Sequence, residues 1–134
     1  MDIIDLTSGP FTQRKVGPGE IIFLKDQHAD EAYVILKGDV EAGSQSRDGK
    51  FIVLSRMKAG EMFGEIALLS PDGKRTASTM SEGGCELLVV PRDIFDKRLQ
   101  KADPLLHFVI GHLCRRLITL SDRVVDAGLE ESHT

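Results

Sequence analysis

The chain has 134 residues, a formal net charge of -4 and 41% hydrophobic residues. A chain of this length forms one domain with a core large enough to need no disulfide or metal staple, so we expect a single domain over residues 1–134. The excess of acidic over basic residues argues against a domain that binds nucleic acid through its phosphates.

Three features of the sequence bear on the cellular location of the protein. No apolar run approaches the roughly 20 residues that span a membrane, and the first residues are acidic where a signal peptide would be basic. Cys85 and Cys114 lie far apart among apolar neighbours, which favours buried, reduced thiols over a disulfide or a metal pair. The sequence therefore predicts a soluble cytoplasmic protein that contacts no membrane.

Short apolar runs separated by glycines fill the first two thirds of the chain, a pattern typical of antiparallel β structure. We expect strands over residues 11–16, 21–24, 32–37, 39–43, 50–57, 75–80 and 85–90. The pair Asp48-Gly49 is the strongest hairpin signal among the turns. Together these elements predict a wound β-roll.

Helix signals replace the glycines after residue 90. Pro91-Arg92-Asp93 begins a short amphipathic helix, and Asp103-Pro104 supplies an N-cap and a first-turn proline for a longer one. We expect these helices within residues 91–127, with Gly128 ending the second. A polar, disordered tail over residues 129–134 should follow.

The longer helix carries an apolar seam whose members recur in steps of four and three. They are Leu106, Ile110, Leu113, Leu117, Leu120 and Val124. Because the seam spans fewer than three heptads, it could pack on its own domain or pair with a second copy. We favour the second alternative, a parallel homodimer.

Residues 63–77 contain the most informative stretch. Gly64 permits a backbone turn, after which residues 65–69 can form one short helical turn that the sequence Pro71-Asp72-Gly73 ends. The first amides of such a turn have no backbone acceptor and suit an anion.

Two charged side chains flank this turn. Arg75 offers a planar fork that can grip two phosphate oxygens, and the small Ala77 lets a ligand approach the backbone. Glu65 would repel an anion, but it has a use if it accepts a hydrogen bond from a sugar hydroxyl. The alternative is an ordinary surface ion pair between Glu65 and Arg75.

The stretch resembles the phosphate-binding cassette of cyclic nucleotide-binding domains, a module shared by catabolite activator proteins, protein kinase A regulatory subunits and cyclic-nucleotide-gated channels. The motif reads Phe63-Gly64-Glu65-Ile66-Ala67-Leu68, followed by Arg75-Thr76-Ala77. The resemblance covers almost the whole chain, including residues 18–23, 32–40 and the closing helices. It implies a mainly β fold, an eight-stranded antiparallel β-roll (jelly roll) over about residues 9–90.

The resemblance also implies a site for cyclic AMP or cyclic GMP. Arg75 and nearby amides would hold the cyclic phosphate, Glu65 would hold the ribose, and Gly64 would leave room for the sugar. Thr76 could reach the amino group of a guanine, and the last helix would cap the base and move on binding. The implied ligand set is Phe63, Gly64, Glu65, Ile66, Ala67, Arg75, Thr76, Ala77, Leu113, Arg116, Leu117 and Leu120.

By the same resemblance, the protein is a signalling module and not an enzyme, and it needs no metal or cofactor besides its nucleotide ligand. The chain stops where bacterial relatives continue into a helix-turn-helix, so we expect an unidentified effector protein as the partner and no nucleic acid. Removal of Arg75 should weaken ligand binding and hardly change stability.

Two alternatives from other classes stay open. A cupin-type metalloenzyme needs closely spaced ligands on barrel strands, whereas the histidines lie in an acidic loop, on the last helix and in the tail. They are His28, His107, His112 and His133. A degenerate roll that only associates with other proteins would keep the fold and bind no nucleotide.

Overall fold

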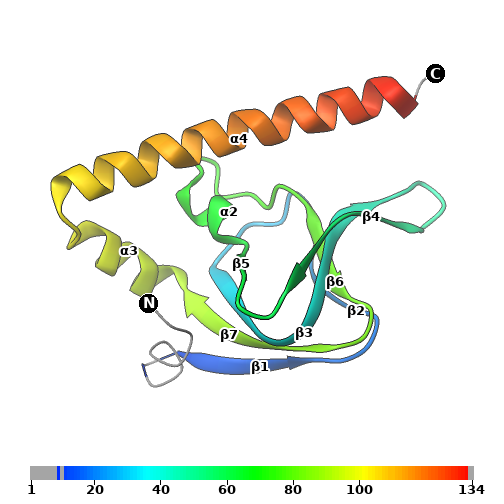
Figure 1. Cartoon of the computed structure of the whole chain (residues 1–134), viewed down its shortest axis with the longest axis horizontal. Coiled ribbons are helices and arrows are strands. Elements are labelled where there is room, and N and C mark those ends of the chain that lie inside the picture. The colour runs from blue at the N-terminus through cyan, green and yellow to red at the C-terminus, as the bar shows by residue number, and fades with distance from the viewer. Residues whose placement is uncertain (1–8, 10, 133–134) are drawn as a thin grey trace.

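The computed structural model describes residue 9 and residues 11–132, with side chains described up to residue 120. A roll of antiparallel strands is followed by two helices, the longer of which crosses over one side of the roll (Figure 1). The strands are β1 (Thr12–Val16), β2 (Glu20–Phe23), β3 (Glu31–Gln45), β4 (Phe51–Lys58), β5 (Met62–Phe63), β6 (Ser78–Ser81) and β7 (Cys85–Pro91). The helices are α2 (Glu65–Leu69), α3 (Arg92–Gln100) and α4 (Pro104–Ser132).

Strand β3 organises the roll because it belongs to both of its layers. Its first half pairs with β7 and β5, and its second half pairs with β4 and β6. Strands β1 and β2 extend the two layers by pairing with β7 and β6. The expected β-roll is confirmed, with seven strands among the described residues where eight were expected.

The strand count differs because Gly38 bends β3 and does not end it. Its φ is 83°, and a Cβ there would lie 2.5 Å from the Gly84 carbonyl oxygen. Only glycine tolerates both conditions, so the chain turns the corner without leaving the strand. Residues 32–37 and 39–43, expected as two strands, are therefore one.

The hairpin between β3 and β4 turns at the predicted Asp48-Gly49 pair. Gly49 has a φ of 83°, and the Ser46 amide donates to the Lys50 carbonyl over 2.7 Å. This hairpin extends beyond the roll (Figure 1). The prediction of a hairpin at this pair is confirmed.

Alternating residues of the strands fill the core between the layers, as the period of a β-strand requires. The main cluster is Val16, Ile22, Phe23, Tyr33, Ile35, Val40, Phe63, Cys85, Leu87 and Val89. A second cluster lies beneath α2 and α3 and contains Ala29, Ala32, Val34, Ala67, Leu68, Leu88 and Val90. Cys85 and Cys114 are both buried and free, as expected.

Helix α4 begins where its capping residues predict. The Leu105 amide donates to the Asp103 carboxylate over 2.9 Å, and Pro104 opens the first turn. The prediction that Gly128 ends the helix was wrong, because α4 continues to Ser132. One interior glycine costs a helix only about 1 kcal/mol, and no proline follows to stop it. The tail was expected from residue 129, and its last two residues lie outside the described residues.

Along residue 9 and residues 11–132, no helix combines the length and the apolar character needed to cross a membrane.

Tyr33 gives the core a spectroscopic probe, because it is the chain's single tyrosine. Its ring packs on Phe23 and Phe63, and its hydroxyl donates to the Glu31 carboxylate. Burial and this contact with Glu31 raise the pKa of Tyr33 to about 12. The neutral phenol is thus favoured by folding, and that contribution is lost as the pH rises from 10 towards 12.

We therefore predict that phenolate absorbance in the folded protein rises with a midpoint near pH 12, well above the ordinary 10. The same titration in denaturant should return the midpoint to the ordinary value. A midpoint near 10 in folded protein, verified by circular dichroism, would show that Tyr33 is not held in this core.

Candidate functional site

A cavity of about 210 Å³ lies between the start of α2 and the inner face of β6. Eight of the residues predicted from the motif line it: Phe63, Gly64, Glu65, Ile66, Ala67, Arg75, Thr76 and Ala77. Five more were not predicted: Phe23, Ala42, Met57, Met62 and Thr79. They come from strands β2, β3, β4, β5 and β6, whose meeting in space the sequence motif does not encode.

Helix α2 occupies residues Glu65–Leu69, as the sequence predicts. Gly64 precedes it with a φ of 81°, a conformation that favours glycine. A Cβ on Gly64 would lie 2.7 Å from Nη1 of Arg75, so the glycine also leaves space for the guanidinium. The Ser70 amide closes the last turn on the Ile66 carbonyl over 2.8 Å, and Pro71 prevents a further turn.

Arg75 is only 4% exposed and is bonded to the backbone at two places. Nη1 donates to the Gly64 carbonyl oxygen over 2.8 Å, and Nη2 donates to the Glu31 carbonyl oxygen over 2.5 Å. The guanidinium carbon lies 3.9 Å from the centroid of the Phe23 ring. These contacts fix the plane of the guanidinium group beside the cavity.

The charge of Arg75 is left without a bonded carboxylate. Its two acceptors are carbonyl oxygens, and Glu31 directs its carboxylate to the Tyr33 hydroxyl. No ion pair joins Glu65 to Arg75, both of which the structure describes, so the surface ion-pair alternative was wrong. A guanidinium has five N–H donors, so three stay free for an anion.

The expectation that removing Arg75 leaves stability unchanged must be corrected. Its loss would free two largely buried carbonyl oxygens and remove the group stacked on Phe23. Such orphaned acceptors typically cost about 1–3 kcal/mol each. Arg75 is therefore both a structural residue and a candidate ligand residue.

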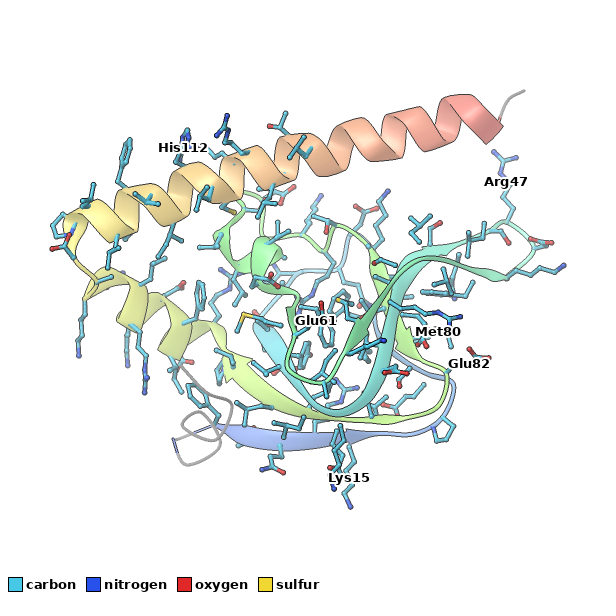
Figure 2. All side chains as sticks on the ribbon, viewed as in Figure 1. Lys15, Arg47, Glu61, Met80, Glu82 and His112 are labelled. Atoms are coloured by element: carbon cyan, nitrogen blue, oxygen red, sulfur yellow. The ribbon has the colours of Figure 1, made fainter. Side chains whose placement is uncertain are left out.

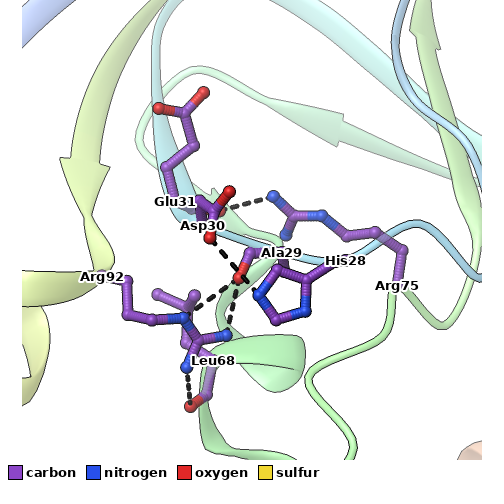
Figure 3. Close-up of polar contacts among 7 residues, drawn as sticks. All are labelled: His28, Ala29, Asp30, Glu31, Leu68, Arg75 and Arg92. Atoms are coloured by element: carbon purple, nitrogen blue, oxygen red, sulfur yellow. Dashed lines mark hydrogen bonds and ion pairs between the residues drawn. The ribbon is translucent and has the colours of Figure 1, made fainter.

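A second arginine, Arg92, was missed by the sequence analysis. Nη2 and Nε donate to the Ala29 carbonyl oxygen over 2.6 and 3.1 Å, and Nη1 lies 3.5 Å from the Leu68 carbonyl oxygen. Figure 3 shows Arg92 and Arg75 reaching the same segment around Ala29 and Glu31 from two sides. The two arginines thus tie the two ends of α2 to the start of β3, and no spacing in the sequence signals this.

Glu65 lies at the first position of α2 and is half-buried. Burial raises the pKa of Glu65 above its ordinary 4.5. Glu65 also borders an apolar groove between α2, α3 and α4, to which Phe95 and Ile110 contribute. A buried carboxylate without a cation beside it can accept a hydrogen bond from a ligand hydroxyl at little extra desolvation cost.

None of the side chains of α4 that the structure describes, up to residue 120, lines the cavity. Leu113, Arg116, Leu117 and Leu120, expected to cap a base, are exposed and do not line it. Helix α4 instead rests on α2, with Cys114 buried at 5% exposure. Figure 2 shows the side chains on the far side of α4, such as that of His112, pointing away from the roll.

The histidines are not gathered in the roll. His28 is exposed beside Asp30 at 3.4 Å, whereas His107 and His112 lie on the exposed surface of α4. His133 lies outside the described residues. Among the side chains described between residues 11 and 120, no group of three His, Cys, Asp or Glu residues is arranged to hold a metal ion.

The family model described as cyclic nucleotide-binding domain matches residues 13–102. The chain is 29% identical over 100 residues to the cAMP-activated global transcriptional regulator CRP of Haemophilus influenzae, covering 75% of this chain and 45% of the relative. The chain spans about half the length of the curated relatives it matches.

Solved structures give the same result. The cAMP-bound form of the EAL enzyme Bd1971 superposes with a TM-score of 0.72 at 26% identity, covering 91% of this chain and 31% of that one. A structure described as cAMP-bound PfPKA-R superposes with a TM-score of 0.59 at 32% identity, covering 65% of this chain and 30% of that one. This chain belongs to the cyclic nucleotide-binding domain family. The curated relatives reported above are described as cAMP-activated transcriptional regulators.

The contacts of Arg92 generate a test of how α2 is held. We predict that Arg92→Ala lowers the free energy of unfolding by about 2 kcal/mol, because buried carbonyls at Ala29 and Leu68 lose their donor. Urea denaturation followed by circular dichroism measures this loss.

Lys97→Ala, an exposed change on the same helix, is the control and should leave stability within about 0.5 kcal/mol. If Arg92→Ala proves as stable as the control, the arginine does not hold α2.

Proposed function

We propose that this protein is a cytoplasmic, non-enzymatic regulatory module that binds a 3′,5′-cyclic purine nucleotide, cyclic AMP or cyclic GMP, in the cavity between α2 and β6. The observation that carries the proposal is the charge of Arg75, which is fixed at the cavity wall and bonded only to backbone carbonyls. A buried cation in this state is suited to an anionic ligand.

The other lining groups suit the remaining parts of the ligand. The free amides of Ile66 and Ala67 at the start of α2, and the amide of Ala77, face a phosphate held by Arg75. Glu65 accepts from the ribose hydroxyl. The nucleotide is the ligand and not a cofactor, and no metal or prosthetic group is required.

The output of binding is a change in the packing of α4. Helix α4 rests on α2, whose first turn supplies the phosphate amides, so a shift of α2 is transmitted through the contact around Cys114. In the bound state the face carrying Leu113, Arg116, Leu117 and Leu120 turns to cap the base.

Helix α4 also carries the surface for a partner. Its exposed apolar residues are Leu105, Leu106, Phe108, Val109, Ile110, Leu113, Leu117 and Leu120. A stripe of this length is larger than a monomer usually leaves in water. We assign it to a parallel homodimer, which then presents the regulated surface to an effector protein and not to nucleic acid.

Two features support cyclic AMP and cyclic GMP as joint candidates. Relatives and solved structures of this family are described as cAMP-activated or cAMP-bound, and the enzyme Bd1971 is also described in a cGMP-bound form. Thr76 is exposed at the cavity, where its hydroxyl could meet the amino group of a guanine.

Calorimetric titration of refolded, nucleotide-free protein tests the proposal. We predict binding of cyclic AMP, and loss of about a hundredfold in affinity in Arg75→Ala, because a charge-assisted contact with the phosphate disappears. Glu65→Gln should weaken binding less, and it should bind a 2′-deoxy analogue as well as the parent does.

Arg14→Ala is a matched control on β1, because Arg14 pairs with Glu20 away from the cavity. It should bind as the parent does, with folding of every variant verified by circular dichroism. If the parent shows no heat with either nucleotide at millimolar concentration, the degenerate-roll alternative replaces the proposal.

The dimer is tested by sedimentation across a concentration series, with and without cyclic AMP. We predict a concentration-dependent dimer. Leu117 is 51% exposed in the single chain and would be buried in the dimer, so Leu117→Glu would bury a charge there and should give a monomer. Thr119→Glu, on the polar side of α4, is the control and should still dimerise. A parent that stays monomeric throughout would contradict the assignment.

A further inference from the structure

Strand β6 carries three buried hydroxyl side chains, and one of them has no partner. The Ser78 hydroxyl oxygen accepts from the Lys25 amide over 2.9 Å, and the Ser81 hydroxyl donates to the Asp39 carbonyl over 2.6 Å. Thr79 is 3% exposed, and its Oγ1 has no hydrogen-bond partner among the described residues.

An unpartnered buried hydroxyl destabilises a fold. It has lost its hydrogen bonds to water without replacement, whereas a valine of the same shape would fill the position at no such cost. Buried polar side chains in folded proteins almost always have a partner. Thr79 is an exception, so we look for a hydrogen-bond partner that the free protein does not supply.

The position of Thr79 indicates what that group is. Thr79 lines the cavity proposed for the nucleotide and is paired with Ala42 and Phe23 of the neighbouring strands. It follows Ala77 by two residues, which in extended chain is about 7 Å further along. Thr79 therefore lies beyond the part of the cavity assigned to the phosphate.

The wall around Thr79 offers little else that is polar. Phe23, Ala42 and Met57 contribute apolar surface there, and Glu65 and Arg75 are assigned to the ribose and the phosphate. A threonine exchanges its hydroxyl and methyl group by one rotation about the Cα–Cβ bond. The hydroxyl can thus turn into the cavity without movement of the backbone.

We infer that the Thr79 hydroxyl is a further ligand contact, which hydrogen-bonds a polar atom of the nucleoside beyond the phosphate. This inference rests on the proposed function and adds to it a residue outside the motif. In the free protein this hydroxyl has no hydrogen-bond partner, so a ligand that supplies one binds more tightly.

Thr79→Val tests the inference through two readouts of opposite sign. The melting temperature of the free protein should rise by about 2–5 °C, because the orphan hydroxyl is gone. The affinity for cyclic AMP should fall about five- to tenfold, because one hydrogen bond to the ligand is lost. Thr79→Ser keeps the hydroxyl and should retain most of the affinity.

Ser81→Ala is the matched control on the same strand. Its hydroxyl serves Asp39 inside the protein, so this change should lower the melting temperature and leave the affinity unchanged. A merely structural hydroxyl at Thr79 would behave like that of Ser81.

The outcomes separate this inference from the proposed function. If the parent binds cyclic AMP and Thr79→Val binds it equally well, or melts at a lower temperature than the parent, the inference is overturned and the proposed function stands. If the parent binds neither nucleotide, both fail.

Discussion

The site depends on the hydrogen bonds of one guanidinium group. Arg75 bonds the Gly64 carbonyl at the start of α2 and the Glu31 carbonyl at the start of β3, while its plane lies over Phe23. Burying a charge costs free energy unless other groups replace many of the lost contacts with water. Here carbonyl dipoles and an aromatic face replace them, so the charge is stabilised without being neutralised. The guanidinium group is consequently held in a fixed orientation in the wall of the cavity.

Helix α2 connects this charge to the rest of the molecule. Arg75 holds its first end and Arg92 its last, and α4 lies across it. With five residues, α2 has too few internal hydrogen bonds to be stable alone, so its orientation is determined by these neighbours. Glu65 borders the cavity proposed for the nucleotide and also the groove beneath α4. A ligand that changes the position of α2 therefore changes the surface on which α4 rests.

The sequence predicted the local elements but not the contacts between segments that are far apart in the chain. The bounds of α2, the Asp103 cap and the Asp48-Gly49 hairpin follow from nearest-neighbour chemistry, and the motif collects eight of the lining residues. The continuity of β3 through Gly38 depends on the distant Gly84 carbonyl, which no local pattern contains. Arg75 and Arg92 donate their hydrogen bonds to backbone carbonyl oxygens. Every residue has such an oxygen, so no residue type in the sequence marks these partners. The apolar period of α4 likewise predicts a helix with a seam but not the face that docks on α2.

A binding module and a degenerate roll are expected to differ in whether the charged groups that line the cavity are paired with each other. A cation, Arg75, and a half-buried carboxyl, Glu65, line one cavity without pairing, and burial raises the pKa of Glu65. A roll that served only as a scaffold would gain stability by pairing them or by replacing both with apolar residues. Burial of each group without a partner of opposite charge costs free energy. Under the proposed function, a ligand with an anion at one end and a hydroxyl donor beside it, as in a ribose cyclic phosphate, would supply a partner to each group.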